Sequence, residues 1–281
     1  MGLDMKKLIT NIPGLNALRA TNAWQMFRHR IVERYGEREN STFTGFLRLP
    51  AQFEALAGPV IEYVLANGAV KDLRVGVIGC SNGSEAYTIA SVIKNRRPDV
   101  RFTVNAYDID NEMIKKAREA SYPRDDVYNN KIISESFVRD TFDADKGVYR
   151  VKDGIRSRVS FALADALDAG LKSAVGGHDI VFAQNFIFHM KPGMARKAFN
   201  NICLIVNPGG AFFADGVDLD IRQELTKTNG LTPMEFKIEE IHNEARLARA
   251  IGWPYSYWGL EPFLSVKKDW KRRYSTIFLR S

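Results

Sequence analysis

The sequence predicts an α/β fold, with a mainly parallel sheet of seven strands behind a short N-terminal helical segment. Short apolar runs alternate with helical stretches between residues 73 and 215, which is typical of parallel strands covered by helices on both faces. A turn that contains Gly79 and Gly83 follows the first run, and glycines there let a ligand approach the backbone closely. The chain has 281 residues, 45% of them hydrophobic, which is enough to bury such a sheet.

Residues 1–70 form the predicted N-terminal helical segment. The stretch 22–37 carries apolar side chains at helical spacing, and 53–64 continues this pattern across a break at Gly58-Pro59. We expect both stretches to pack on the main domain, and the first is also a candidate lid over a binding site.

Residues 71–281 form the predicted main domain. Five strands are expected at 74–78, 102–107, 159–163, 179–185 and 210–215, with helices at 84–95, 111–120 and 192–206. The tail adds a helix at 234–251 and a strand pair at 255–260 and 274–279, which completes the seven strands. The alternation lapses between 122 and 158, where we expect a small insertion with a hairpin formed by 147–151 and 154–159.

The net charge of +7 is concentrated at the two ends of the chain. Residues 1–40 carry seven basic and four acidic side chains, and residues 266–281 carry six and one, whereas 41–265 is nearly neutral. No apolar run reaches the roughly 18 residues of a membrane span, and the N-terminus lacks the apolar core of a secretory signal. Cys80 and Cys203 cannot build a disulfide framework, so we expect a cytoplasmic protein without a membrane span.

Polar residues follow several of the predicted strands. Asp108 follows the second strand, Asp165 the third, and Asn185 ends the fourth. The carboxyl ends of parallel strands share one edge of the sheet, where nucleoside-containing ligands bind, and an acidic residue after the second strand can accept hydrogen bonds from a ribose. The alternative is that Asp108 or Asp110 only caps the following helix. The GxGxxG and Walker motifs are absent, which disfavours a dinucleotide or phosphate ligand.

Five stretches of the chain resemble the chemotaxis-receptor methyltransferases, the CheR family of S-adenosylmethionine (SAM) enzymes. They are TFTGFLR at 42–48, GSEAYTIA at 83–90, AYDID at 106–110, IKKAR at 114–118 and VFAQNFI at 181–187. The resemblance covers roughly residues 42–216. It implies a Rossmann-like class I methyltransferase fold that uses SAM as cofactor and releases S-adenosylhomocysteine (SAH).

The resemblance also implies where SAM binds. Thr44 and Arg48 would contact the cofactor and face the transferred methyl group, and Glu85 would lie near its methionine part. Asp108 would bind the ribose. The other expected cofactor contacts are Gly79, Gly83, Ile109, Asp165, Ala166, Asn185 and Phe186.

Arg48 and His189 are the expected catalytic residues. An arginine can hold a carboxylate through two parallel hydrogen bonds. A carboxylate acceptor needs no general base, whereas a hydroxyl or ammonium acceptor must lose a proton. His189, Asp215 and Asp218 are candidate bases because they follow strands four and five, although each could instead be structural. No metal is expected, since the four histidines and two cysteines do not show metal-ligand spacing.

The acceptor side of the expected site departs from the family. Gln184 stands where the family has an arginine, and 215–218 reads DGVD where the family usually has Gly-His-Ser-Glu. The N-terminal region is short for the family's receptor-contacting domain, and an aromatic segment at 253–258 extends the tail. We therefore expect a small-molecule acceptor, methylated on oxygen or nitrogen, with a protein carboxyl group as the alternative.

Other functions stay open at this point. The basic cluster at 267–273, with Trp270 and Tyr274, offers charge and stacking surfaces suited to an RNA methyltransferase, although a solvated loop is the simpler expectation. A SAM-sensing module, or an enzyme that uses SAM for chemistry other than methyl transfer, would need the same cofactor residues. The absent GxGxxG disfavours an NAD-linked oxidoreductase. The sequence does not indicate an oligomeric state.

Overall fold

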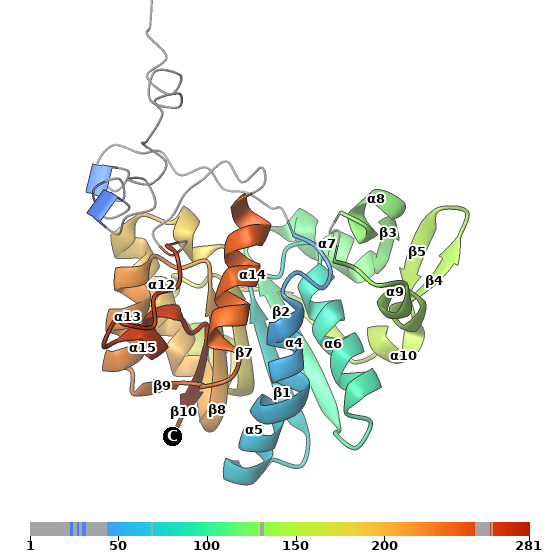
Figure 1. Cartoon of the computed structure of the whole chain (residues 1–281). Coiled ribbons are helices and arrows are strands. Elements are labelled where there is room, and N and C mark those ends of the chain that lie inside the picture. The colour runs from blue at the N-terminus through green and yellow to red at the C-terminus, as the bar shows by residue number, and fades with distance from the viewer. Residues whose placement is uncertain are drawn as a thin grey trace, which may run out of the picture.

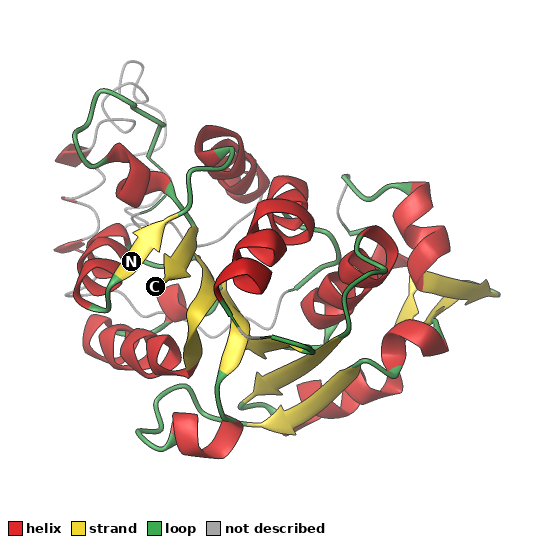
Figure 2. Ribbon diagram, turned by 90° about the horizontal axis from the view of Figure 1, so that it is seen from below, coloured by secondary structure: helices red, strands yellow, loops and turns green. Residues whose placement is uncertain are grey.

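The computed structural model describes residues 44–68, 70–129, 132–250, 259 and 261–281, and the separate positions 23, 24, 27, 30 and 31. A central sheet lies between two layers of helices, and a small second sheet lies at one end of the molecule (Figures 1 and 2). The predicted α/β class is confirmed. Across these residues no helix is both long and apolar enough to cross a membrane. Most of the expected helix and lid at 22–37, and all of the aromatic segment at 253–258, lie outside the described residues.

The central sheet has seven strands in the order β6-β2-β1-β7-β8-β10-β9. Their bounds are β1 (Leu73–Ile78), β2 (Phe102–Asp108), β6 (Val159–Leu163), β7 (His178–Gln184), β8 (Val206–Asp215), β9 (Leu231–Pro233) and β10 (Ile277–Arg280). β1 pairs in parallel with β2 on one side and with β7 on the other, and the β2–β6 and β7–β8 pairs are also parallel. The strand order therefore reverses between β1 and β7, and this switch point is where ligands of such sheets bind.

Helices cover both faces of the sheet. One face carries α4 (Pro50–Ala55), η1 (Leu56–Val60), α5 (Ile61–Asn67), α6 (Ser84–Arg96), α7 (Asn111–Glu119) and α14 (Ile238–Ala250). The other carries α11 (Leu171–Val175), α12 (Pro192–Ile205) and α13 (Leu219–Thr228). In β7, Phe182 packs in the first core and Val181 in the second, as the alternation of a strand requires. The apolar side chains of residues 46–64 share the first core, so this part of the predicted N-terminal segment packs with the sheet.

The insertion expected at 122–158 is a small antiparallel sheet with short helices around it. Its elements are β3 (Ser121–Pro123), α8 (Arg124–Val127), α9 (Glu135–Thr141), β4 (Phe142–Asp145), β5 (Val148–Val151) and α10 (Asp153–Arg156). β5 pairs with β3 and β4, so the hairpin expected between 147–151 and 154–159 was wrong. Lys146 and Gly147 both have positive φ, 47° and 84°, which turns the chain tightly between β4 and β5.

The C-terminal strand pairing also differs from the prediction. β10 runs antiparallel between β8 and β9, so β9 occupies the place expected for 255–260, of which only residue 259 is described. β9 and the preceding helix α13 were not predicted, and a three-residue strand is too short to show an alternating pattern. The last strand starts later than expected because Trp270–Tyr274 form helix α15.

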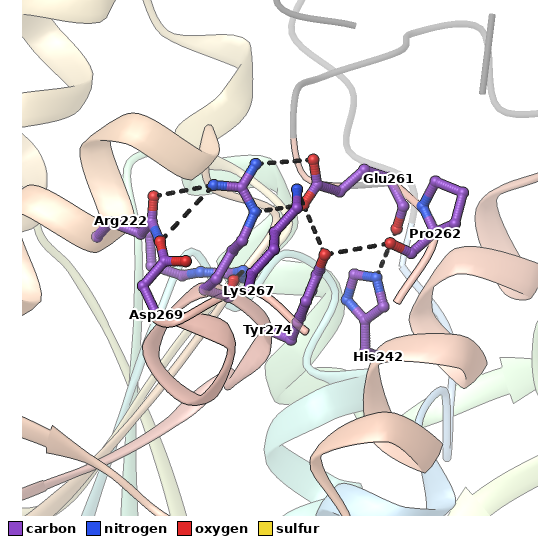
Figure 3. A network of polar contacts seen from close by, with 9 residues as sticks. Arg222, His242, Glu261, Pro262, Lys267, Asp269 and Tyr274 are labelled. Atoms are coloured by element: carbon purple, nitrogen blue, oxygen red, sulfur yellow. Dashed lines mark hydrogen bonds and ion pairs between the residues drawn. The ribbon is translucent and has the colours of Figure 1, made fainter. Parts of the chain in front are cut away.

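A buried ionic network centred on Glu261 ties these C-terminal elements together (Figure 3). Its carboxylate accepts hydrogen bonds from Nε and Nη2 of Arg273, from the Tyr274 hydroxyl at 2.8 Å and from Lys267 at 3.1 Å. His242 Nε2, on α14, donates to the Glu261 backbone oxygen at 2.7 Å. Burial alone would raise the pKa of Glu261, but the hydrogen bonds from Arg273 and Tyr274 outweigh burial and lower it. The expectation of a solvated loop at 267–273 was therefore wrong for Arg273, which is buried.

Candidate active site

A cavity of about 480 Å³ opens at the carboxyl edge of the sheet, beside the β1–β7 switch point. Of the cofactor-binding and catalytic residues expected from the sequence, all but Gly83 line this cavity: Thr44, Arg48, Gly79, Glu85, Asp108, Ile109, Asp165, Ala166, Asn185, Phe186 and His189. The further candidate bases Asp215 and Asp218 are buried and do not line it. Loops after β1, β2, β6 and β7 thus bring together residues that are far apart in the chain, as the parallel sheet requires.

Gly79 is the point at which a ligand can come closest to the backbone. Its φ is +76°, and a Cβ at this position would lie 2.7 Å from the ring of Phe186. The N–H groups of Gly79 and Cys80 both donate to the carbonyl of Tyr107 on β2, at 2.8 and 3.0 Å, which fixes the turn. Burial and the nearby Asp108 raise the pKa of the Cys80 thiol, so Cys80 is a packing residue of this turn rather than a nucleophile.

Gly83 ends the same turn, at the start of α6. It precedes α6 with a φ of +87°, and a Cβ there would lie 3.0 Å from Ala117 and from the ring of Phe161. The absence of a side chain therefore lets α6 pack closely on α7 and β6. Gly83 shapes the cavity through this packing and does not line it.

Asp110 and not Asp108 caps the following helix, as the position of Asp110 directly before Asn111 favoured. Asp110 caps α7 by accepting hydrogen bonds from the N–H groups of Glu112 and Met113, at 2.8 and 3.3 Å. The carboxylate of Asp108 accepts from the N–H of Ser81 at 2.7 Å and from the N–H of Asp110 at 3.0 Å. Asp108 is thereby held in one orientation at the cavity wall, with lone pairs left on both oxygens for a ligand.

The wall beyond β6 and β2 combines apolar surface with fixed polar groups. Ile109 is 70% exposed at the rim of the cavity and contributes apolar surface to it. Asp165 accepts a hydrogen bond from the N–H of Leu167 at 2.8 Å, which fixes the loop that contains Ala166. A flat apolar ring with polar edges would fit between these two loops.

Glu85 and Arg48 form the charged end of the cavity. Glu85 lies in the first turn of α6, and its burial raises its pKa to about 7, an effect that Arg48 opposes and the buried carboxylate of Asp215 strengthens. Burial therefore favours the protonated form of Glu85 near neutral pH much more than water would. A cationic ligand would favour its ionised form.

The end of β7 supplies an unusual backbone and two buried polar side chains. Asn185 has a φ of +62°, and its N–H donates to the carbonyl of Asp215 at 3.0 Å, so its side chain turns out of the sheet toward the cavity. His189 is buried in the one-turn helix η2 (Ile187–His189), with its ring centre 4.0 Å from that of Phe188. Gln184 also lines the cavity, although the sequence marked it only as a departure from the family.

Further lining residues were not expected from the sequence. They include Ser81 in the β1 turn, and Met190, Lys191 and Met194 around the start of α12. Their position in the loops after β1 and β7 was the available signal, but such residues are common in loops and carry no motif. Among the described residues, no group of three His, Cys, Asp or Glu side chains could hold a metal ion.

Comparison with known proteins identifies the family. Residues 42–224 match the family described as CheR methyltransferase, SAM binding domain. The chain belongs to the CheR methyltransferase family. Its curated relatives include the probable biofilm formation methyltransferase WspC of Pseudomonas putida, 27% identical over 60% of this chain and 40% of that protein. Chemotaxis protein methyltransferase 1 of Pseudomonas aeruginosa is 30% identical over 57% of this chain and 60% of that protein.

This CheR-family chain spans about half the length of the curated relatives it matches. Among solved structures, a putative sarcosine dimethylglycine methyltransferase from Galdieria sulphuraria is similar, with a TM-score of 0.40 and 12% identity over 79% of this chain and 82% of that chain.

SAM, the cofactor of the CheR domain, fits the residues that the cavity presents. The close approach allowed at Gly79 and the oriented carboxylate of Asp108 suit a nucleoside. Glu85, which a cation would help to ionise, suits the ammonium group of a methionine. The individual contacts of Thr44, Arg48 and the other expected residues stay predictions.

Proposed function

We propose that this CheR-family protein transfers a methyl group from SAM to a side-chain carboxylate of a partner protein. The observation that carries the proposal is Arg48, which lies in the cavity wall close enough to Glu85 to lower its pKa. An arginine at this end of the cavity can hold an anionic acceptor beside the cofactor. The names of two relatives, which are chemotaxis protein methyltransferases, support a protein as acceptor.

SAM supplies a methyl group that is already activated on a sulfonium, so this chain has to position the acceptor and exclude water. In the proposed mechanism Asp108 accepts hydrogen bonds from the ribose, and the ionised Glu85 binds the methionine ammonium. Arg48 donates two parallel hydrogen bonds to the acceptor and directs one carboxylate oxygen toward the methyl group. A carboxylate has no proton to lose, so the transfer needs no general base.

A hydroxyl or amine acceptor is the second candidate, because His189 lines the cavity and is buried. In that case His189 would remove the acceptor's proton, and the small-molecule acceptor expected from the sequence would gain support. The RNA acceptor loses support, since Arg273 belongs to the buried Glu261 network and is not part of a solvated basic surface.

The proposal is tested by incubating the purified protein with SAM labelled in its methyl group and with fractionated bacterial extract. We expect label in a protein band, released as methanol by mild alkali, which is characteristic of a carboxyl methyl ester. Arg48→Ala should abolish this label. The matched control is Arg196→Ala, which removes a half-exposed arginine that pairs with Glu224 outside the cavity. Label that withstands alkali would refute the carboxylate acceptor, and SAM binding without any label would indicate a sensor.

A further inference from the structure

A chain of buried amides leads from the cavity wall to the last strand of the sheet. Gln184, the last residue of β7, donates from Nε2 to Oε1 of Gln52 on α4 at 2.7 Å. Gln52 in turn donates from Nε2 to the Thr276 hydroxyl, directly before β10, also at 2.7 Å. The three residues are 8%, 1% and 3% exposed, so the cavity is the part of this chain that a ligand can reach.

The amide oxygen of Gln184 is the end of the chain that faces the ligand. In the described part of the molecule, the only hydrogen bond of the Gln184 side chain is the one from Nε2 to Gln52. Its Oε1 therefore has no donor from the protein, although the side chain is more than nine-tenths buried and forms part of the cavity wall. This oxygen is open to the cavity and is not sealed inside the protein, so a ligand group in the cavity can form a hydrogen bond with it.

The position of Gln184 assigns this ligand group to the acceptor rather than to the nucleoside. In the strand order, β2 and β6 carry Asp108 and the Asp165 loop on one side of β1, whereas β7 lies on the other side. The side chain of Gln184 leans toward α4 and β10, away from those nucleoside loops. It lines the same cavity as Arg48, which precedes α4 in the chain.

The hydrogen-bonded series Gln184–Gln52–Thr276 can present either a donor or an acceptor to the cavity. In the structure each glutamine donates toward Thr276, which leaves Oε1 of Gln184 facing the cavity. Rotating both amides by half a turn keeps the heavy atoms in place, because a hydroxyl can donate as well as accept. Thr276 would then donate to Gln52, Gln52 to Gln184, and the NH₂ group of Gln184 would face the cavity.

We propose that Gln184 contacts the methyl acceptor and helps to select it, and that Gln52 and Thr276 are positioning residues that let it act as donor or acceptor. The inference rests on the proposed function for the class of acceptor. A carboxylate acceptor would be bound by the orientation of Gln184 in which its NH₂ group faces the cavity and donates to the carboxylate. The contact is neutral, so it orients the carboxylate without adding a second positive charge beside Arg48. A hydroxyl or amine acceptor would take the opposite form.

The test uses the full chain and two capped amino acids as probes, N-acetylglutamate methylamide for the carboxylate and N-acetylserine methylamide for the hydroxyl. Methyl transfer to each probe is followed by mass spectrometry, and SAH affinity is measured separately by calorimetry. Gln184→Glu keeps the shape of the side chain, but its carboxylate cannot donate. We expect this variant to raise KM for the carboxylate probe at least tenfold and to change the Kd of SAH less than threefold.

The positioning residues have their own readout. Thr276→Val should raise KM for the carboxylate probe severalfold without a matching loss of kcat. Thr276→Ser keeps the hydroxyl and should have the KM of the wild type. Gln223→Leu is the control, since Gln223 donates to Asp269 outside the cavity and should leave both KM and SAH affinity unchanged. The double variant Gln184→Leu/Gln52→Leu removes both partners of the buried bond and so tests the contact without a lone buried amide.

Two results would overturn the inference. One is a tenfold loss of SAH affinity in the double variant, which would place Gln184 in the donor site. The other is a Gln184→Glu variant with wild-type KM for the carboxylate probe. Methylation of the hydroxyl probe alone would refute the proposed function. It would still support the inference if Gln184→Glu keeps that activity and the double variant loses it, because the hydroxyl of the probe can donate to the carboxylate of Gln184→Glu.

Discussion

The pH dependence of SAM binding tests the role of Glu85 directly. The pKa of Glu85 is about 7, raised from 4.5 chiefly by burial. If the SAM ammonium returns this pKa to its ordinary range, each binding event at low pH must expel one proton. SAM affinity should then be constant well above pH 7 and fall about tenfold for each pH unit below it, so that Kd at pH 6 is about ten times Kd at pH 8.

Calorimetry at pH 6, 7 and 8, in two buffers with different enthalpies of ionisation, measures both Kd and the proton released. Glu85→Gln keeps the size of the side chain and removes the titration, so its SAM affinity should be lower at pH 8 and should lose the tenfold change. Any titration of the cofactor's own amine is shared by the two proteins and cancels in the comparison. The reasoning is refuted by a Kd in the wild type that does not change between pH 6 and pH 8, or by an equal slope in the variant.

Three further variants probe the cavity and the C-terminal network, and a fourth, Glu235→Ala, is the control for the network. Asp108→Ala should weaken SAM binding about 100-fold by calorimetry, since two hydrogen bonds to a charged group are worth roughly 3 kcal/mol, with circular dichroism confirming the fold. Gly79→Ala should weaken SAM binding at least tenfold, because the new methyl group displaces the Phe186 ring that would lie 2.7 Å away; unchanged affinity would contradict this. In urea unfolding, Glu261→Ala should cost about 3–5 kcal/mol by leaving a buried arginine without its carboxylate. Glu235→Ala breaks the exposed Lys271–Glu235 pair and should lower the free energy of unfolding by less than about 1 kcal/mol. Equal losses in the two variants would show that the buried network stabilises the fold no more than an exposed pair does.

The parts of the site that the sequence predicted are those at the ends of long, regular strands. Asp108 and Asn185 could be placed at one edge because parallel strands with a clear apolar core fix which end their last residues occupy. The sequence favoured Asp110 as the cap of the following helix, because it stands directly before Asn111, and the structure confirms this. The contact that orients Asp108 could not be predicted, since it comes from the N–H of Ser81, which belongs to the turn after another strand.

The last third of the chain was predicted less well, for a similar reason. The strand at 277–280 has a clear apolar pattern, but its neighbour β9 has only three residues and shows none. The basic cluster at 267–273 looked solvated because its charges stand close together in the sequence. Arg273 is buried because its counter-charge, Glu261, lies twelve residues earlier, and only folding brings the two together.

The sequence by itself determined the fold class, because strands, helices and the glycine turn follow from local patterns of apolar and special residues. Its motifs resembled one family, and that resemblance implied most of the expected cavity residues. The tertiary structure alone decided the raised pKa of Glu85, the Glu261 network and the Gln184–Gln52–Thr276 chain. Each of these depends on burial and on polar atoms that meet across elements distant in the sequence. Desolvation and hydrogen bonding act through space, so no local pattern in the chain could have revealed them.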